Sequence, residues 1–331
     1  MQSWLPRSRI PVFRSAEAMT GFLRAKDAAT PALAAYSSVL GGIVTDEVAM
    51  SVPIDDHGFH RGHCVFDTAN VAGGKAFGLS MHLDRLLGSA QQARIDTSAL
   101  EKDTLKRIIL ETIGATERRD GVFVRYWLTA GRGDFGISPK NCVEPSFYCV
   151  VHDDSHGGND RGLSAAPVDV PLKPPLLATA KTNNYMINAL VAMEAEAKGA
   201  QLGVQFEADG HLAESSVATI AVVGKDGILV SPPADSILAS TTWARVRALA
   251  PSLVDAGVLR GCEARRVKRD ELSDAAELLS LGGGWVEPIT TYDGAPVGDG
   301  TPGPAWKALD AIVRADLSNP ELVDEVPYVA Q

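Results

Sequence analysis

Short stretches of alternating apolar and polar residues are interleaved along this chain with stretches of helical period, in no regular order. Residues 122–129 alternate with a period of two, as a strand with one buried face does. Residues 80–95 and 100–115 place their apolar residues at helical spacing instead. A doubly wound parallel sheet would require a regular strand–helix alternation, so the pattern predicts an α+β fold. The residues expected to face the core are Val122, Val124, Tyr126 and Leu128 in the strand, and Leu83, Leu86, Leu87, Ala90, Leu105, Ile108, Ile109 and Ile113 in the helices.

The chain is long enough to need more than one hydrophobic core. At 331 residues, two domains are the ordinary expectation. The segment 131–144, GRGDFGISPKNCVE, is rich in glycine, polar residues and proline, which is typical of a connection. We therefore predict a small N-terminal domain at residues 1–136, an interdomain loop at 131–144 and a larger C-terminal domain at 145–331. Residues 14–35 are expected to form a helical extension of the first domain.

Composition narrows the class of protein. A formal net charge of −10 argues against nucleic acid or an anionic membrane as a partner, since both require a basic face. Four cysteines without paired spacing suggest reduced thiols. The first residues lack the apolar run of a signal peptide, and no run of eighteen apolar residues occurs. We expect a cytoplasmic protein.

Lys181 is the first residue that suggests chemistry. It stands in LLATAKTNNYMINALV, just before a segment of helical period. A helix N-terminus disfavours a nearby cation, and the apolar neighbours Leu176 and Leu177 favour the neutral amine. A neutral lysine amine is a nucleophile. Taken alone, a lysine in a surface loop is the simpler interpretation.

Three further segments carry side chains that suit an anionic, pyridine-containing ligand. Glu214, in DGHLAESSVATIAVV, is a carboxylate at the start of an apolar strand, where it could keep a pyridine nitrogen protonated. Arg85 lies at the border of a buried helix face, which suits a bidentate grip on phosphate. Thr241 and Thr242 open a helix, where backbone N–H groups and hydroxyls form a generic anion site. The ordinary alternatives are a solvated glutamate, a surface arginine and simple N-capping by Ser240 or Thr241.

In this order and at these separations, the segments resemble the fold-type IV pyridoxal-phosphate family, which contains D-amino-acid aminotransferases, branched-chain aminotransferases and aminodeoxychorismate lyase. The motifs are DDHGFHRGHCVFDT, HLDRLLGSA, AKTNNY, LAESS, SILASTT and VEPITTYDGAPVGDGTPGP, and the resemblance extends over roughly residues 35–305. It is greatest for plant-type D-amino-acid aminotransferases, whose strand reads close to HRGHxVFDTA. The spacing from Lys181 to Tyr185 also resembles the D-amino-acid enzymes and the lyase, because branched-chain enzymes typically insert one more residue.

The resemblance implies a small N-terminal α/β domain and a larger C-terminal α/β-barrel-like domain, with pyridoxal 5′-phosphate in the cleft. Lys181 would carry the cofactor as a Schiff base and move the proton between substrate Cα and cofactor C4′. Glu214 would pair with the pyridine nitrogen. The cofactor-binding residues implied are Arg85, Lys181, Glu214, Ser216, Thr241 and Thr242. Members are usually homodimers whose sites borrow loops from the partner.

The function implied is a ping-pong transamination. A D-amino acid such as D-alanine would donate the amino group, and a 2-oxo acid such as 2-oxoglutarate or pyruvate would accept it. Four alternatives stay open: an L-branched-chain aminotransferase, an (R)-selective amine transaminase, a lyase of the aminodeoxychorismate type, and a cofactor-binding protein without catalysis.

The substrate carboxylate needs a clamp, which arginine supplies best. Arg61 and Arg132 are the candidates, and Phe66 would form part of the pocket wall. Arg125 could also face the site, but pairing within its strand neighbourhood is the preferred interpretation. The chain departs from many relatives at Gly282–Gly284, where they have a hydroxyl beside the phosphate. Backbone amides there could still bind an anion.

The histidines at 57, 60 and 63 invite a metal site. They stand in a glycine-containing loop and not on one helix face, and no cysteine accompanies them. Structural zinc sites usually have four ligands, commonly cysteine and histidine together. We therefore predict no metal.

Overall fold

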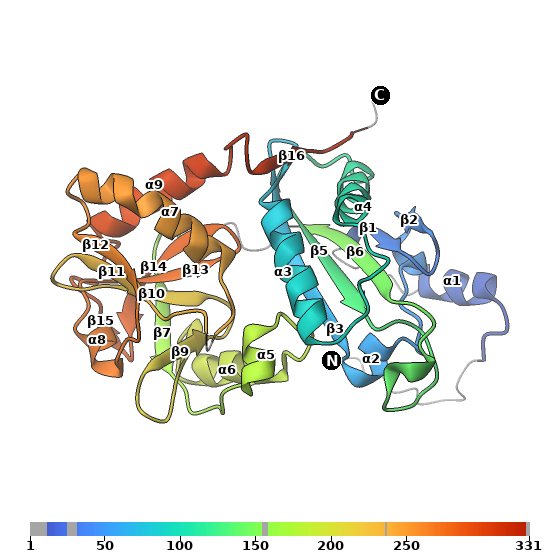
Figure 1. Ribbon diagram of the computed structural model, residues 1–331, viewed down its shortest axis with the longest axis horizontal. Coiled ribbons are helices and arrows are strands. Elements are labelled where there is room, and N and C mark those ends of the chain that lie inside the picture. Colours follow the sequence, from blue (N-terminus) through green and yellow to red (C-terminus); the bar gives the residue numbers. More distant parts are fainter. Residues whose placement is uncertain (1–11, 25–31, 154–157, 236, 329–331) are drawn as a thin grey trace.

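Two β-sheets, each with helices packed on it, form the structure, a computed structural model that describes residues 12–24, 32–153, 158–235 and 237–328 (Figure 1). The first sheet has seven strands in the order β16-β4-β3-β5-β6-β1-β2. The second has nine, in the order β12-β11-β10-β13-β14-β7-β8-β9 with β15 beside β14. Most neighbouring strands are antiparallel, with parallel pairs at β7·β8, β7·β14 and β11·β12. The predicted α+β class is confirmed.

The strands of the first sheet are β1 (Ala32–Ser37), β2 (Gly42–Val44), β3 (Cys64–Ala72), β4 (Lys75–Phe77), β5 (Val122–Thr129), β6 (Ser146–Asp153) and β16 (Val323–Glu325). Those of the second are β7 (Leu163–Pro167), β8 (Leu202–Phe206), β9 (Leu212–Ser215), β10 (Thr219–Val223), β11 (Ile228–Ser231), β12 (Gly261–Ala264), β13 (Glu277–Gly282), β14 (Trp285–Tyr292) and β15 (Ala295–Pro296). The α-helices are α1 (Ala16–Arg24), α2 (His57–Arg61), α3 (Leu79–Gln92), α4 (Lys102–Gly114), α5 (Pro175–Thr179), α6 (Met186–Ala197), α7 (Thr241–Asp255), α8 (Arg269–Ser273) and α9 (Pro304–Asp316). Short 3-10 turns lie at Glu47–Ala49 and Pro139–Asn141.

One face of the first sheet is covered by α3 and α4 (Figure 1). The alternation in β5 decides which side chains enter that core: Val122, Val124, Tyr126 and Leu128 are all buried there, as predicted. The same parity continues across β3, whose odd-numbered residues, such as Val65, face the helices. The even-numbered residues of β3 and the intervening residues of β5 therefore lie on the opposite face of the sheet.

The second sheet is covered on two sides. Helices α7 and α9 pack on β10, β13 and β14 through a core that includes Trp243, Val246, Leu309 and Val313. Helix α6 packs on β7 and β8 through Val191 and Ala195. Leu190 of the same helix is exposed.

The predicted interdomain loop is in the wrong place. Strands β5 and β6 pair antiparallel from Val122↔Asp153 to Thr129↔Ser146, so residues 131–144 join two neighbours of the first sheet. The chain passes to the second sheet between β6 and β7, and β16 later returns to the first sheet beside β4 (Figure 1). Glycine and proline residues show that a segment is a loop, but they do not show whether it joins two domains or two strands of one sheet. The sheet to which each flanking strand belongs depends on its pairing partners, which can lie far away in the sequence.

The predicted helical extension at 14–35 is only partly correct. Helix α1 covers Ala16–Arg24, residues 25–31 lie outside the described residues, and Ala32–Ser37 is the strand β1. The sequence ALAAYS has high helix propensity, but β1 pairs with β6 on one side and β2 on the other. Tertiary pairing therefore overrides a weak local preference.

Candidate active site

Lys181 is positioned by the free edge of β3. The backbone N–H of Phe66 donates to the carbonyl oxygen of Lys181 at 2.9 Å, and that of Asn183 donates to the carbonyl of Cys64 at 2.9 Å. Val65 and Thr182 form an antiparallel bridge between these two bonds. A segment from the second half of the chain thus extends the first sheet locally. This pairing fixes the Lys181 backbone beside β3, and the Lys181 N–H also donates to Ser89 Oγ of α3 at 3.0 Å.

The Lys181 amine lies between two aromatic rings. Its Nζ donates to the Tyr185 hydroxyl at 3.1 Å, and it lies 4.3 Å from the centroid of the Phe66 ring. The two rings meet edge to face with centroids 5.0 Å apart. Burial lowers the pKa of Lys181 to about 8, because a charged ammonium loses hydration there. The sequence suggested two causes for a lowered pKa of Lys181, a following helix and apolar surroundings. Helix α6 begins only at Met186, and burial is the main cause.

Glu214 approaches the same amine from the second sheet. It lies on β9, and its Oε1 accepts a hydrogen bond from the backbone N–H of Leu238 at 3.0 Å. Burial raises the pKa of Glu214, although this bond and the charges of Lys173 and Lys181 oppose the rise. The carboxylate is therefore held in place by the backbone and lies within electrostatic range of the Lys181 amine.

Arg85 lies on α3 and is held by a buried carboxylate on β3. Its Nε and Nη2 donate to the two oxygens of Asp67, each at 2.8 Å. His82 Nδ1 lies 3.1 Å from Asp67 Oδ1. Burial raises the pKa of Asp67, but His82 and Arg85 outweigh it and leave the pKa well below its ordinary range. The remaining nitrogen of the guanidinium, Nη1, donates to the carbonyl oxygen of Ala239 at 3.0 Å.

That last bond brings Arg85 to the N-terminus of α7. Ser240 caps the helix, its Oγ accepting from the N–H of Trp243 at 3.1 Å, and Thr241 is the first helical residue. Thr242 Oγ1 accepts from the N–H of Gly284 at 3.1 Å, in the tight turn between β13 and β14. A 15-residue helix, a guanidinium and a glycine turn therefore converge, and they form a site suited to a phosphate.

Ser216 is buried in the turn after Glu214. Its backbone N–H donates to the carbonyl of Gly203 at 3.1 Å, and its own carbonyl accepts from Asn188 Nδ2 at 2.7 Å. These bonds fix the turn that carries Glu214. A role for the Ser216 side chain near the cofactor ring stays a prediction.

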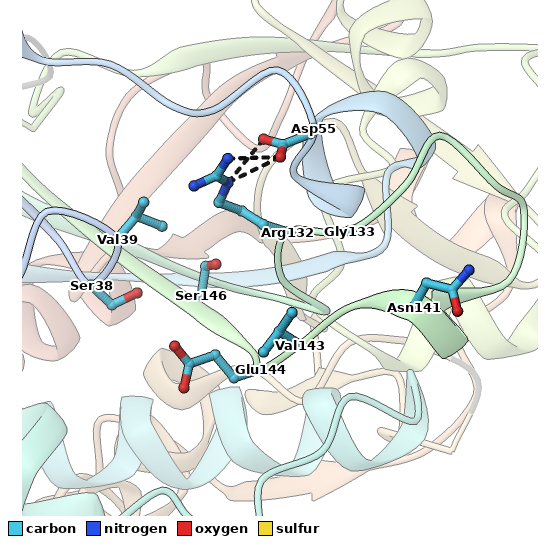
Figure 2. Close-up of a pocket in the computed structure, with 9 residues that line it drawn as sticks. All are labelled: Ser38, Val39, Asp55, Arg132, Gly133, Asn141, Val143, Glu144 and Ser146. Carbon is cyan, nitrogen blue, oxygen red and sulfur yellow. Dashed lines mark hydrogen bonds and ion pairs between the residues drawn. The ribbon is translucent and has the colours of Figure 1, made fainter.

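The two predicted carboxylate clamps lie elsewhere. Arg61 donates to the carbonyl oxygens of Phe135 and Gly136, so it fastens the 131–144 loop to α2. Arg132 pairs with Asp55, with an Nη2–Oδ2 distance of 2.8 Å, at the wall of a cavity of about 520 Å³ (Figure 2). Neither guanidinium is among the charges that act on Lys181. Within one chain, then, the structure does not bring Arg61 or Arg132 to the Lys181 amine.

Arg125 pairs within its strand neighbourhood, as expected from the sequence, and it also lies on the side of the sheet that carries Phe66. It lies on β5 opposite Thr68 of β3, and its Nε donates to Thr68 Oγ1 at 3.1 Å. Its guanidinium carbon is 5.9 Å from the Phe66 centroid, and its charge acts on Lys181. The described residues contain no carboxylate in ion-pair contact with Arg125. Its position outside the buried alternation of β5 was the available signal, but only the paired strand β3 shows that this face carries the lysine.

The histidines of α2 and the following turn pack against one another. The ring centroid of His57 lies 5.2 Å from those of His60 and His63, and His63 Nδ1 is 3.2 Å from His57 Nδ1. Burial lowers the pKa of His57, and its histidine neighbours add to the effect. Among the residues that the structure describes, no cluster of histidine, cysteine, aspartate and glutamate has the geometry to hold a metal ion.

Comparison with known proteins matches residues 64–291 to the family model for amino-transferase class IV, a range that includes Arg85, Lys181 and Glu214. The chain belongs to the class IV aminotransferases. It is therefore a pyridoxal-phosphate-dependent aminotransferase.

The similar proteins are named either as D-amino-acid aminotransferases or as branched-chain aminotransferases. The chain is 40% identical over 300 residues to the chloroplastic D-amino-acid transaminase of Arabidopsis thaliana, covering 89% of this chain and 80% of that one. It is 27% identical to the D-alanine aminotransferase of Bacillus licheniformis, covering 84% and 96%. It is 31% identical to a putative branched-chain-amino-acid aminotransferase of Methanocaldococcus jannaschii, covering 61% and 70%.

Solved structures share the fold. The branched-chain aminotransferase of Thermoproteus uzoniensis with norvaline superposes with a TM-score of 0.78 at 22% identity, covering 89% of this chain and 99% of that one. The Escherichia coli branched-chain amino acid aminotransferase gives a TM-score of 0.79 at 23% identity, with the same coverage. The predicted fold-type IV architecture is thereby confirmed.

Proposed function

We propose that this aminotransferase transfers the amino group of a D-amino acid, such as D-alanine, to a 2-oxo acid such as 2-oxoglutarate or pyruvate. The observation that carries the proposal is the Lys181 amine, buried between Phe66 and Tyr185 with its pKa lowered to about 8. The choice of D-amino acid rests on the 40% identity to a D-amino-acid transaminase and on the short Lys181–Tyr185 spacing.

The residues present suit pyridoxal phosphate. The Phe66 and Tyr185 rings form apolar walls that a planar ring can lie against, Glu214 is a fixed carboxylate for a pyridine nitrogen, and Arg85 points one guanidinium nitrogen to the start of α7. Thr241 and Thr242 would add N–H and hydroxyl groups to the phosphate there.

When bound, the cofactor draws electrons away from the substrate Cα and so makes its proton acidic. The Lys181 amine would take that proton and return it, because it is neutral in a useful fraction at physiological pH. The Tyr185 hydroxyl, 3.1 Å from Nζ, would orient the amine. Phe66 and Tyr185 would exclude water from it.

Arg125 is the carboxylate clamp that we propose in place of Arg61 and Arg132. It has no ion-pair partner among the described residues, it lies on the lysine face of β5, and it borders Phe66. A guanidinium in this position can bind a carboxylate through two parallel hydrogen bonds. Phe66 then forms the pocket wall between Arg125 and Lys181.

We further propose a homodimer. Phe59 of α2 and Phe135, Ile137 and Val143 of the 131–144 loop, which Arg61 fastens to α2, are exposed apolar side chains that a partner could cover. A second subunit on this surface would cover it and would place Arg61 and Arg132 at the subunit boundary. Sedimentation velocity with wild type and with F135D/I137D tests this: the doubly charged variant should shift toward monomer.

The cytoplasmic location also stays a prediction, because the Arabidopsis relative is named chloroplastic. Among the described residues, no helix is both long and apolar enough to cross a membrane.

The rival function is that of an L-branched-chain aminotransferase, favoured by the 31% identity to the Methanocaldococcus protein of that putative name. The deciding experiment records the visible spectrum of the purified protein before and after adding D-alanine, L-alanine, L-leucine or (R)-1-phenylethylamine without an acceptor. A change with D-alanine alone supports the proposal. A change with L-leucine alone assigns the branched-chain activity, and a response to the amine alone assigns an (R)-amine transaminase.

A further inference from the structure

Lys173 brings a second ammonium group to the ring that contacts the catalytic lysine. It lies just before α5, and its Nζ is 4.6 Å from the centroid of the Tyr185 ring. Lys181 Nζ is 5.4 Å from the same centroid. Both lysine Nζ atoms therefore lie over one phenol ring, and cation–π attraction holds the Lys173 ammonium there.

The charge of Lys173 is not neutralised by a contact ion pair among the described residues. Burial lowers the pKa of Lys173, and Glu214 is the carboxylate that opposes the effect. The same Glu214 also interacts with Lys181. Lys173 therefore stands beside a site carboxylate that it shares with the catalytic amine.

The charges around Lys181 come from five elements. Asp67 on β3 and Glu214 on β9 favour the protonated amine, whereas Arg85 on α3, Arg125 on β5 and Lys173 before α5 oppose it. Asp67 is already engaged with Arg85 and His82 in a compact buried group. Lys173 and Arg125 are thus the cations that act on Lys181 without a carboxylate of their own in the part of the chain that the structure describes.

We propose that Lys173 is a positioning residue of the transamination site, whose ammonium, held on the Tyr185 ring, disfavours protonation of the Lys181 amine and so raises the fraction that can act as nucleophile and base. This proposal rests on the function proposed above for Lys181. Lys173 acts by like-charge repulsion at short range, because Tyr185 holds both amines: the Lys181 amine donates to its hydroxyl and Lys173 lies against its ring. Removing the charge of Lys173 removes a like-charge repulsion and raises the pKa of Lys181.

The test compares K173M, K173R and wild type as full-length protein freed of cofactor. Formaldehyde with cyanoborohydride methylates neutral lysine amines, and mass spectrometry of the Lys181 peptide gives its rate at each pH. In K173M the midpoint of the rate profile should move to higher pH by roughly half a unit to one unit, the size of one nearby charge. In K173R the midpoint should return toward wild type. Lys225, a surface lysine paired with Asp274, supplies the control variant K225M, which should leave the midpoint unchanged.

Two outcomes would overturn the proposal: an unshifted Lys181 midpoint in K173M, or a shift of equal size in K173R. A misfolded variant is recognised separately, because every buried lysine would then methylate faster and the circular dichroism would change. The assay needs neither cofactor nor amino donor. Failure of wild type to respond to any donor would therefore overturn the proposed function and still leave the coupling between the two lysines measurable.

Discussion

Asp67 and Arg85 form a two-point ion pair beneath the phosphate site, with Nε and Nη2 of Arg85 each 2.8 Å from one oxygen of Asp67. Asp67 is fully buried, and the Arg85 side chain is 16% exposed. The pair fixes the plane of the guanidinium and leaves Nη1 directed at the start of α7. The carboxylate therefore orients the arginine that we expect to bind the cofactor phosphate.

Replacing Asp67 by asparagine should loosen that orientation. We expect D67N to bind pyridoxal phosphate roughly tenfold or more weakly, the cost of a misplaced charge-assisted contact. Affinity for pyridoxal, which lacks the phosphate, should change far less. Fluorescence titration of the cofactor-free protein with both compounds measures the ratio. D84N, which breaks the Lys102 ion pair on the outer side of the same helix, is the matched control. Equal losses for the two compounds would contradict the orienting role.

The same variant should also show a defined pH dependence of stability. The pKa of Asp67 is lower in the folded state, so its contribution is present above the unfolded value near 3.9 and is lost as the pH falls toward the folded value. Breaking a buried pair costs about 3 kcal/mol at neutral pH, whereas the exposed D84N should cost under about 1 kcal/mol. Urea unfolding at pH 7 and at pH 3 should show the D67N deficit shrinking in acid. A deficit that does not depend on pH would argue for a packing effect.

The buried amine of Lys181 should lower the free energy of unfolding of the cofactor-free protein. Its pKa falls from an ordinary value of 10.5 to about 8, so folding disfavours the protonated amine below that pH and the penalty disappears as the pH rises above 10.5. K181M should therefore be more stable than wild type at pH 7, by roughly 2 to 3 kcal/mol, and the gain should vanish near pH 11. Thermal melts across this range test the sign. K181M and K181A should both lack turnover, and near-normal activity in either would end the assignment of Lys181.

Glu214 should affect the chemical step more than substrate binding. E214Q keeps the shape of the side chain but removes the negative charge that would hold a pyridine nitrogen protonated. We expect kcat to fall by roughly 100-fold, a cost typical of one lost electrostatic partner, with a smaller change in KM. E263Q, at an exposed position on β12, is the control for loss of charge alone. A rise in KM with kcat unchanged would place Glu214 in substrate binding instead.

Arg125 should discriminate between substrates with and without a carboxylate. R125M should raise KM for D-alanine by roughly 10- to 100-fold, the range expected for a lost charged hydrogen bond. Conversion of (R)-1-phenylethylamine, if detectable, should be unchanged or improved. R132M removes the arginine paired with Asp55 and should leave the KM for D-alanine unaltered, because Arg125 is the proposed clamp. The reverse result, with R132M impaired and R125M normal, would restore the clamp first expected from the sequence.

Local patterns predicted the elements on which the site is built. The alternation in residues 122–129 identified β5 and its buried face, and the helical spacing around Leu83 identified α3, because each pattern reflects burial against one neighbouring surface. Lys181, Glu214 and Arg85 were predicted from the order of their motifs, and all three lie within the range that the family model matches. The segment ALAAYS failed as a helix since its pairing with β6 has no local signature.

The fold class and the family could be predicted from the amino-acid sequence, because they depend on residue types and on spacings of a few positions; the sequence also singled out Lys181 as the candidate catalytic residue. The three-dimensional structure was needed to find that Arg125 lies near Lys181, that Asp67 pairs with Arg85 and that Lys173 and Lys181 lie against the same Tyr185 ring. It also showed that 131–144 joins two strands of one sheet. Each of these depends on which strand edges and helix faces meet, and such contacts join residues far apart in the chain, where periodicity carries no information.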